Sequence, residues 1–311
     1  MKKAAIDIGS NSTRLFIAEI KKNEIVDSIV RETVITRLGK GVEDKSVLGK
    51  KGINKTIGVL KDYSKIIKNK KVSKVQTVAT CAVREAKNAS DFIDQVRKST
   101  SIDIDVIDGK KEADLSFKGA ISDPIIRKSG SFYIIIDIGG SSTEIIYGDR
   151  DKVIYSDSMS AGAVRFTEKF LKDDPPTTEQ IVELRKHLVT LLDKHFKKSP
   201  LTEPDKDSLS AVSLAGTATT MVSIIKKLDK YEPDKIHGHT LAREKIEYLL
   251  LRLSRMKVKD LKHLKGLHPD RADVIIAGVA IQAEITEYFG LDKIIVSESD
   301  ILNGILLDQL S

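Results

Sequence analysis

The sequence predicts an α/β protein built from two similar halves. A short apolar run leads into the residues DIGSNSTR at 7–14, and the run 132–136 leads into DIGGSSTE at 137–144, 130 positions later. Each copy continues into another β-branched run, so each is predicted to form two strands joined by a glycine-rich turn. The length of 311 residues also suits two domains.

The repeated turn has the composition of a phosphate-binding turn. Glycines let backbone N–H groups approach an anion with no Cβ in the way, and serine and threonine hydroxyls add donors. Asp7 and Asp137, each at the end of a strand, are placed to hold a divalent cation directly or through water. Either aspartate could instead cap its own turn. Two copies at domain-sized spacing favour the phosphate interpretation.

In the first half, the pattern predicts strands at 3–8, 14–20 and 24–36, a polar stretch at 39–52 and a helix at 53–69. A strand at 74–80, a helix at 90–98 capped by Ser90 and a strand at 102–107 follow. Three strands followed by alternating helix and strand are typical of α/β folds.

The second half repeats this order. It is predicted to contain strands at 132–138, 143–148, 151–157, 208–214 and 293–297, and helices at 162–171, 178–197, 217–228, 241–255, 271–289 and 299–310. Duplicated ribonuclease-H-like halves with an interdomain cleft characterise the actin/sugar-kinase/heat-shock-ATPase superfold. We predict a first domain of residues 1–118 plus 298–311, onto which the terminal helix packs back, and a second domain of residues 119–297.

Composition narrows the classes of protein. Hydrophobic residues make up 41% and charged residues 31%, which is typical of a folded chain. We expect neither a signal peptide nor a membrane span, and the single Cys81 fits a reducing cytoplasm. The net charge of +7 permits a polyanionic partner, but the lysines are scattered along helices without stacking aromatics, so nucleic acid is not indicated.

Five stretches resemble the exopolyphosphatase/guanosine pentaphosphate phosphohydrolase (Ppx/GppA) family. They are residues 7–14, 79–88, 106–113, 137–144 and 271–278, in family order over essentially the whole chain. The resemblance implies hydrolysis of a terminal phosphoanhydride in inorganic polyphosphate or guanosine pentaphosphate, with Mg²⁺ or another divalent cation as cofactor. Members of the family often form homodimers.

The resemblance also implies roles for single residues. Glu112 matches the base that deprotonates the attacking water, although it could be a solvated glutamate in the first turn of a helix. Arg84 matches an arginine that meets substrate phosphate, although it could pair with Glu85 at the surface. Asp7, Asp137 and Glu144 are the best metal ligands. The phosphate-binding set is Asn11, Ser12, Arg14, Arg84, Gly139, Gly140, Ser141, Ser142 and Thr143, with Arg165 as a further candidate.

Three positions depart from the family pattern. Ser141 stands where a third glycine is usual, Ala215 stands where a second glycine is common, and residues 300–304 lack an arginine that often precedes Gly304, with Leu302 in its place. These departures leave a non-catalytic phosphate or alarmone sensor as an alternative. A kinase of the same superfold is another, with residues 214–217 as its adenosine loop. His237 and His239 have a spacing found in metal sites, but without further ligands a loop role is favoured.

Overall fold

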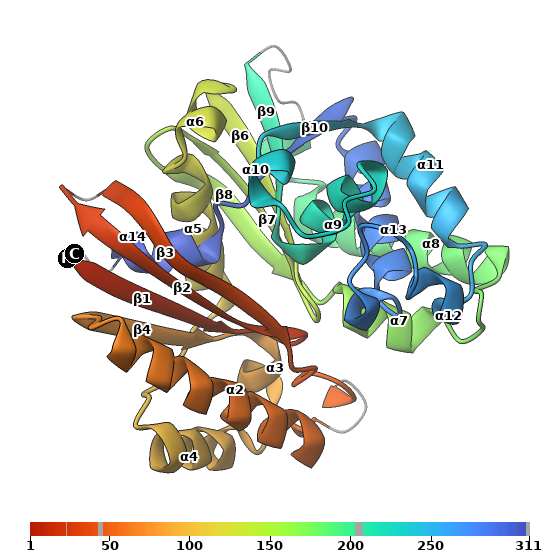
Figure 1. The fold of residues 1–311 in the computed structure, drawn as a ribbon. Coiled ribbons are helices and arrows are strands. Elements are labelled where there is room, and N and C mark those ends of the chain that lie inside the picture. The colour runs from red at the N-terminus through yellow and green to blue at the C-terminus, as the bar shows by residue number, and fades with distance from the viewer. Residues whose placement is uncertain (23, 43–45, 203–207, 309–311) are drawn as a thin grey trace. The chain divides into compact units, whose positions relative to one another are not determined.

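A computed structural model describes residues 1–22, 24–42, 46–202 and 208–308. The chain forms two compact units, the first made of Met1–Ser122 with the segment that begins at Ser299, and the second of Asp123–Glu298. The chain therefore passes into the second unit after Ser122 and returns after Glu298. Figure 1 shows these elements along the chain.

The first unit is a five-stranded mixed sheet covered by helices on both faces. Its strands have the order β3-β2-β1-β4-β5, with β1 antiparallel to β2 and parallel to β4. The strands are β1 (Lys2–Ile8), β2 (Ser12–Lys21), β3 (Glu24–Ile35), β4 (Lys74–Ala79) and β5 (Asp105–Val106). The helices are α2 (Lys50–Asn69), α3 (Cys81–Glu85), α4 (Ala89–Thr100), α5 (Gly109–Ile121) and α14 (Ile301–Asp308).

The alternation of side chains along β1 explains why both faces are covered. Ala4 and Ile6 join the core beneath α2, α3 and α4, whereas Ala5 joins the core beneath α5 and α14. Successive residues of a strand point to opposite faces, so a strand that is apolar throughout must be buried on both.

The second unit has a six-stranded sheet of order β10-β11-β9-β6-β7-β8. The strands are β6 (Phe132–Ile138), β7 (Thr143–Asp149), β8 (Val153–Met159), β9 (Leu209–Leu214), β10 (His239–Ala242) and β11 (Lys293–Val296). The helices are α6 (Pro124–Lys128), α7 (Ala163–Phe170), α8 (Thr178–Phe196), α9 (Ala215–Ile225), α10 (Pro233–Ile236), α11 (Arg243–Leu253), α12 (Val258–Leu261) and α13 (Ile275–Tyr288), with 3₁₀ turns at Pro200–Thr202 and Pro269–Arg271. Ile134, Ile136 and Ile138 of β6 share one core with α8, α9, α11 and α13.

The duplicated α/β fold is confirmed by strand pairing. In each unit the first strand is antiparallel to the second, the second to the third, and the first is parallel to the fourth. The registers also correspond, because Asp7 faces Arg14 and Asp137 faces Glu144. Within the described ranges, no helix has the length and apolar character needed to cross a bilayer.

Several elements differ from the sequence prediction. Helix α4 begins at Ala89 after Asn88, not at Ser90, and the Asn88 side chain bonds to the Leu48 backbone. The strand predicted at 102–107 is reduced to Asp105–Val106. The pattern does not predict α5 or α6, and it merges β10 with α11. The five-residue α6 and the four-residue β10 carry too few periodic residues to be separated from their neighbours. The 13-residue α5 buries Glu112, Ser116 and Gly119 beside its apolar residues, which obscures its hydrophobic period. The last two residues of the predicted terminal helix lie outside the described residues.

Candidate active site

Main-chain hydrogen bonds hold the first glycine-rich turn in place. The N–H of Gly9 donates to the carbonyl of Ser12 at 2.9 Å, and the carbonyl of Asn11 accepts from Thr36 and Arg37 at 3.0 and 2.9 Å. Asn11 and Ser12 remain partly exposed. The turn therefore presents two polar residues on a fixed backbone.

The second turn repeats this geometry. The N–H of Gly139 donates to the carbonyl of Ser142 at 2.9 Å, and the carbonyl of Gly140 accepts from Arg165 at 3.1 Å at the start of α7. The Nε of Arg165 donates to the carbonyl of Ser141 at 2.9 Å. Arg165 therefore stabilises the turn through two of its carbonyl groups, those of Gly140 and Ser141.

The departure at Ser141 is tolerated by the backbone. Ser141 does not adopt a positive φ, so its Cβ causes no strain of the kind that demands glycine. Glycine is required nearby at Gly162, where a Cβ would lie 2.4 Å from the carbonyl of Gly140. Serine at position 141 is therefore compatible with the backbone conformation of the turn.

Two carboxylates face each other behind the second turn. Asp137 and Glu144 are partners across β6 and β7, and their exposed fractions are 8% and 1%. Ser158 Oγ donates to Glu144 Oε1 at 2.6 Å. Thr143 is fully buried and its hydroxyl donates to the carbonyl of Ala161, so its side chain has a structural role here.

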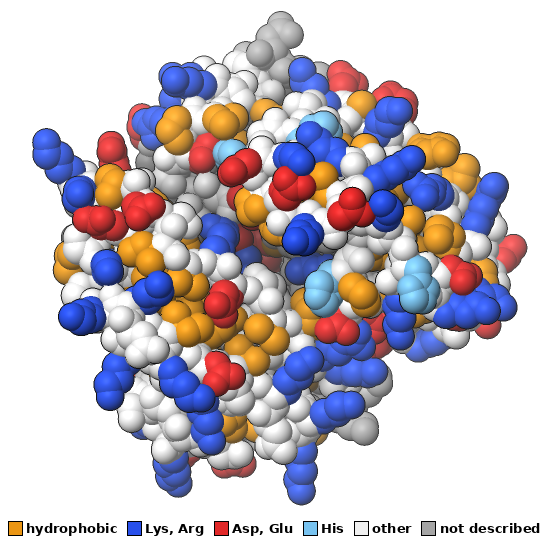
Figure 2. Space-filling view, viewed as in Figure 1, with side chains coloured by type: hydrophobic (Ala, Val, Ile, Leu, Met, Phe, Trp, Pro, Cys, Tyr) orange, Lys and Arg blue, Asp and Glu red, His pale blue; other side chains and the backbone are white. Residues whose placement is uncertain are grey.

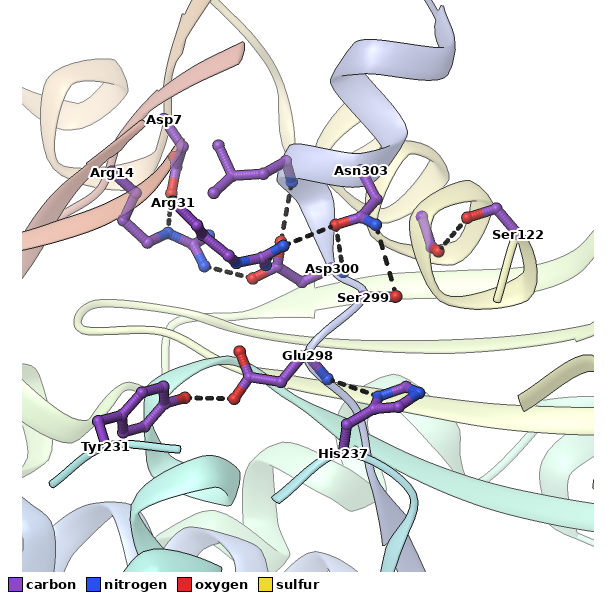
Figure 3. A network of polar contacts seen from close by, with 12 residues as sticks. Asp7, Arg14, Arg31, Ser122, Tyr231, His237, Glu298, Ser299, Asp300 and Asn303 are labelled. Atoms are coloured by element: carbon purple, nitrogen blue, oxygen red, sulfur yellow. Dashed lines mark hydrogen bonds and ion pairs between the residues drawn. The ribbon is translucent and has the colours of Figure 1, made fainter. Parts of the chain in front are cut away.

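In the first unit, Asp7 belongs to a buried ion-pair network (Figure 3). The Nη2 of Arg14 lies 2.8 Å from Asp7 Oδ2, and its Nη1 lies 2.5 Å from Asp300 Oδ2. Arg31 Nη2 reaches Asp300 Oδ1 at 3.1 Å, and Arg31 Nη1 donates to Asn303 Oδ1 at 3.2 Å. The two arginines thus tie the start of α14 to β2 and β3.

The network shifts the two aspartates in opposite directions. Burial raises the pKa of Asp7, while Arg14 opposes the shift. Burial also disfavours the charged form of Asp300, but Arg14 and Arg31 outweigh it and lower the pKa of that carboxyl. Asp300 is therefore the firmly ionised member of the pair.

Asp300 and Arg31 are not found by the sequence motifs. The available signal is the missing arginine before Gly304. Its place is taken by Leu302, which is 1% exposed in the core beneath α14. In this chain the arginines of the network come from β2 and β3, and the terminal segment supplies the acid Asp300.

Glu112 and Arg84 are brought together by elements that are remote in sequence. Arg84, on α3, donates through Nη1 to the carbonyl of Ile107 at 2.8 Å and pairs with Glu112 Oε2 at 3.2 Å. Glu112 lies in the first turn of α5, after the N-cap Asp108, and its side chain is only 10% exposed. This burial contradicts the alternative of a solvated glutamate.

Comparison with known proteins identifies the family of this chain. The model of the Ppx/GppA phosphatase family matches residues 5–311. This chain belongs to the Ppx/GppA phosphatase family.

Relatives of this Ppx/GppA chain cover nearly all of it. It is 34% identical to exopolyphosphatase 2 of Mycobacterium tuberculosis over 317 residues, which are 98% of this chain and 97% of that protein. It is 37% identical to the bifunctional 3-dehydroquinate synthase/phosphatase of Fusobacterium nucleatum over 98% of its own length, and it spans about half, 46%, of that relative.

Solved structures agree with the same fold. The Aquifex aeolicus member of the Ppx/GppA family has a TM-score of 0.82 and 32% identity, with 100% of this chain and 97% of the other covered. An exopolyphosphatase-like protein has a TM-score of 0.92 and 28% identity, with 99% and 97% covered.

The carboxylates of this Ppx/GppA chain fit a magnesium ion whose remaining ligands are water and substrate phosphate. Across the part of the chain that the structure describes, no group of three or more His, Cys, Asp or Glu residues is assembled for a metal. Mg²⁺ keeps several waters and usually binds one or two protein carboxylates together with substrate phosphates. Asp7 in one unit, and Asp137 with Glu144 in the other, supply buried carboxylates of this kind.

His237 of this Ppx/GppA chain has a structural role. His237 Nε2 lies 3.2 Å from Asp123 Oδ1, and His237 Nδ1 accepts from the N–H of Glu298 at 3.2 Å (Figure 3). His239 lies on β10 and not in a loop. These contacts connect the first and last residues of the second unit.

The proposed adenosine loop at 214–217 forms the junction of β9 and α9. Ala215 adopts φ 60°, a left-handed conformation that favours glycine. A Cβ on Gly216 would lie 1.9 Å from the guanidinium of Arg271. The Arg271 side chain therefore covers Gly216, where a kinase would need room for adenosine.

Proposed function

We propose that this protein is an exopolyphosphatase that hydrolyses the terminal phosphoanhydride bond of inorganic polyphosphate and releases orthophosphate. The observation that carries the proposal is the buried Glu112 carboxylate 3.2 Å from the Arg84 guanidinium. A general base and a phosphate-binding cation side by side are what an attack by water on a phosphoryl group requires.

Glu112 acts on the nucleophile. Its carboxylate accepts a proton from the attacking water as the water oxygen bonds to the terminal phosphorus, and the bridging P–O bond breaks. The carbonyl of Ile107 accepts from Arg84 at 2.8 Å, which fixes the plane of the guanidinium. A planar guanidinium is suited to phosphate oxygens. In the free protein, the ion pair with the same guanidinium holds the Glu112 carboxylate in place.

The two turns bind the phosphates of the substrate. Asn11 and Ser12 in the first unit, and the backbone of Gly139–Ser142 in the second, supply uncharged donors. Asp7 in the first unit, and separately Asp137 with Glu144 in the second, are the carboxylates that would hold Mg²⁺. The charge of Mg²⁺ would neutralise phosphate oxygens during transfer. Arg14 contacts Asp7 at 2.8 Å, so in this proposal it positions that carboxylate.

The alternatives have less support. Arg271 covers the loop that a kinase would offer to adenosine. A non-catalytic sensor would bind phosphate without needing a buried acid beside Arg84, since an unprotonated carboxylate repels phosphate. Guanosine pentaphosphate has the same type of terminal bond, so it belongs in the assay as a second substrate.

The test is phosphate release from long-chain polyphosphate, tripolyphosphate and guanosine pentaphosphate, with and without Mg²⁺. We expect Glu112→Gln to bind substrate normally and to lose turnover by roughly 10²–10⁴-fold, the usual effect of a positioned general base. Asp114→Asn, on the same helix, makes the same change of charge and should remain active. Near-normal turnover in Glu112→Gln would rule out this role.

A further inference from the structure

The positive charge of this protein is concentrated in one segment. Residues 50–71, which are helix α2 and the two lysines after it, contain eight lysines and one aspartate, a net charge of +7. The whole chain also has a net charge of +7, from 52 basic and 45 acidic residues. The remainder, with 44 of each, is neutral, so the lysines are not evenly scattered as the sequence pattern suggests.

The lysines lie on the side of α2 that faces away from the core. The buried residues are Ile53, Thr56, Leu60 and Tyr63. The opposite side, here called the lysine face, consists of the exposed Lys51, Lys55, Lys61, Lys65 and Lys68. Basic side chains stand out over the part of the surface that contains α2 (Figures 1 and 2). A helix of 20 residues is about 30 Å long, so the face is an extended strip.

The stability of the helix does not explain this arrangement. Its first turn contains no acidic residue, and lysines at that end oppose the helix dipole. Lys51 and Lys55, and likewise Lys61 and Lys65, are like charges four residues apart, which destabilise a helix. Lys65 pairs with Asp62, the one acidic residue in the segment. The arrangement of these lysines therefore lowers the stability of α2.

The strip begins beside the first phosphate turn. A Cβ on Gly52 would lie 3.0 Å from Leu38 Cα, and a Cβ on Gly39 would lie 2.7 Å from Ser10 Cβ. The segment 37–40 therefore connects the start of α2 with the turn, and it adds Arg37 and Lys40 to the path. All of these residues belong to the first unit.

We propose that the lysine face binds the distal part of a long polyphosphate chain whose terminal phosphate lies at the Gly9–Ser12 turn. The inference rests on the proposed function and adds a preference for long chains. A linear polyanion of regularly spaced charges is complementary to a strip of point charges on flexible side chains. A single-stranded nucleic acid would also need aromatic side chains for stacking, and the one aromatic residue of α2, Tyr63, is buried.

The experiment replaces Lys51, Lys55, Lys61 and Lys65 by glutamine. The matched control replaces the exposed Lys186, Lys194, Lys245 and Lys262, which lie on or near helices of the second unit, and makes the same change in charge. Hydrolysis of long-chain polyphosphate and of tripolyphosphate is measured at two ionic strengths. Direct binding of long-chain polyphosphate and of a single-stranded oligonucleotide is measured in the Glu112→Gln background.

In the α2 variant, we expect KM and Kd for long-chain polyphosphate to rise roughly tenfold, since exposed charge contacts are individually weak but act together. The value of kcat/KM for tripolyphosphate should stay within about twofold, and the long-chain Kd should become less sensitive to salt. The control variant should behave like the wild type.

Equal losses in both variants, or equal losses for both substrates, would overturn the proposal. So would a loss confined to oligonucleotide binding, which would assign the strip to nucleic acid. If the wild type releases no phosphate from either substrate, the proposed function fails by itself, and the binding comparison still decides the role of the lysine face.

Discussion

At the scale of single residues, the contacts of Arg84 depend on the planar shape of its guanidinium as well as on its charge. Its Nη1 reaches the carbonyl of Ile107 and the carboxylate of Glu112 at once, so the planar guanidinium is held on one edge. A lysine ammonium keeps the charge but cannot reproduce this geometry.

We therefore expect Arg84→Lys to lower kcat/KM by roughly ten- to a hundredfold, because one charge-assisted contact is worth about 1.5–3 kcal/mol. The loss should be similar at low and high salt, since it comes from geometry. Arg97→Lys, at an exposed pair with Asp103, serves as the control. A silent Arg84→Lys variant would mean that the arginine contributes only long-range charge.

Ala215 is a residue at which the chain accepts backbone strain. With φ 60°, its Cβ crowds the following carbonyl. We expect Ala215→Gly to stabilise the protein by about 1 kcal/mol, the lower end of the penalty for a non-glycine residue in this region. Urea unfolding should show the gain, whereas Ala218→Gly, further along the same helix α9, should destabilise the protein. A destabilised Ala215→Gly protein would show that the methyl group contributes packing that outweighs the strain.

At the scale of elements, α5 and α14 approach each other through glycines. A Cβ on Gly119 would lie 1.9 Å from the carbonyl of Asp300, and a Cβ on Gly304 would lie 1.9 Å from the carbonyl of Leu115. The obstacles are backbone atoms, so a larger residue must push the helices apart.

We expect Gly119→Ala to destabilise the protein by about 1–3 kcal/mol or more, the usual range for an overpacked contact. Gly58→Ala makes the same change on α2, where nothing lies within 4 Å, and should stabilise by about 0.5–1 kcal/mol because alanine favours helix. Thermal unfolding of the two variants tests the pair. Equal shifts would mean that the two helices are less closely packed than described.

At the scale of the whole molecule, the C-terminal segment completes the first unit. Asp300 anchors this segment to Arg14 and Arg31, and its side chain is only 5% exposed. The arginines lower its pKa in the folded state. Its contribution to stability is therefore present above the unfolded pKa of about 3.9 and is lost as the pH falls through the lower, folded value.

We expect Asp300→Asn to reduce the stability by less than the about 3–5 kcal/mol of a fully buried broken pair, because Arg31 is 24% exposed. The difference in Tm from wild type should be largest near neutral pH and should shrink below about pH 4. Asp308→Asn, whose partners Lys111 and Lys118 are more than 40% exposed, should change Tm little. A difference that is independent of pH would exclude the ionic explanation.

The sequence by itself determined the duplicated α/β architecture and the family. These depend on local signals, because a period of two, a glycine-rich turn and an aspartate at a strand end are visible without distant contacts. The corresponding registers of Asp7 with Arg14 and of Asp137 with Glu144 follow directly from the repeated phrase.

Only the tertiary structure decided how these residues are paired. Arg84 and Glu112 are 28 positions apart, and Arg14 and Asp300 are 286 positions apart, so no local pattern predicts either contact. The burial of Glu112, the anchoring role of Asp300 and the outward strip of lysines on α2 depend on which faces the core covers. Burial and charge pairing are properties of packing, and packing joins residues that the sequence keeps apart.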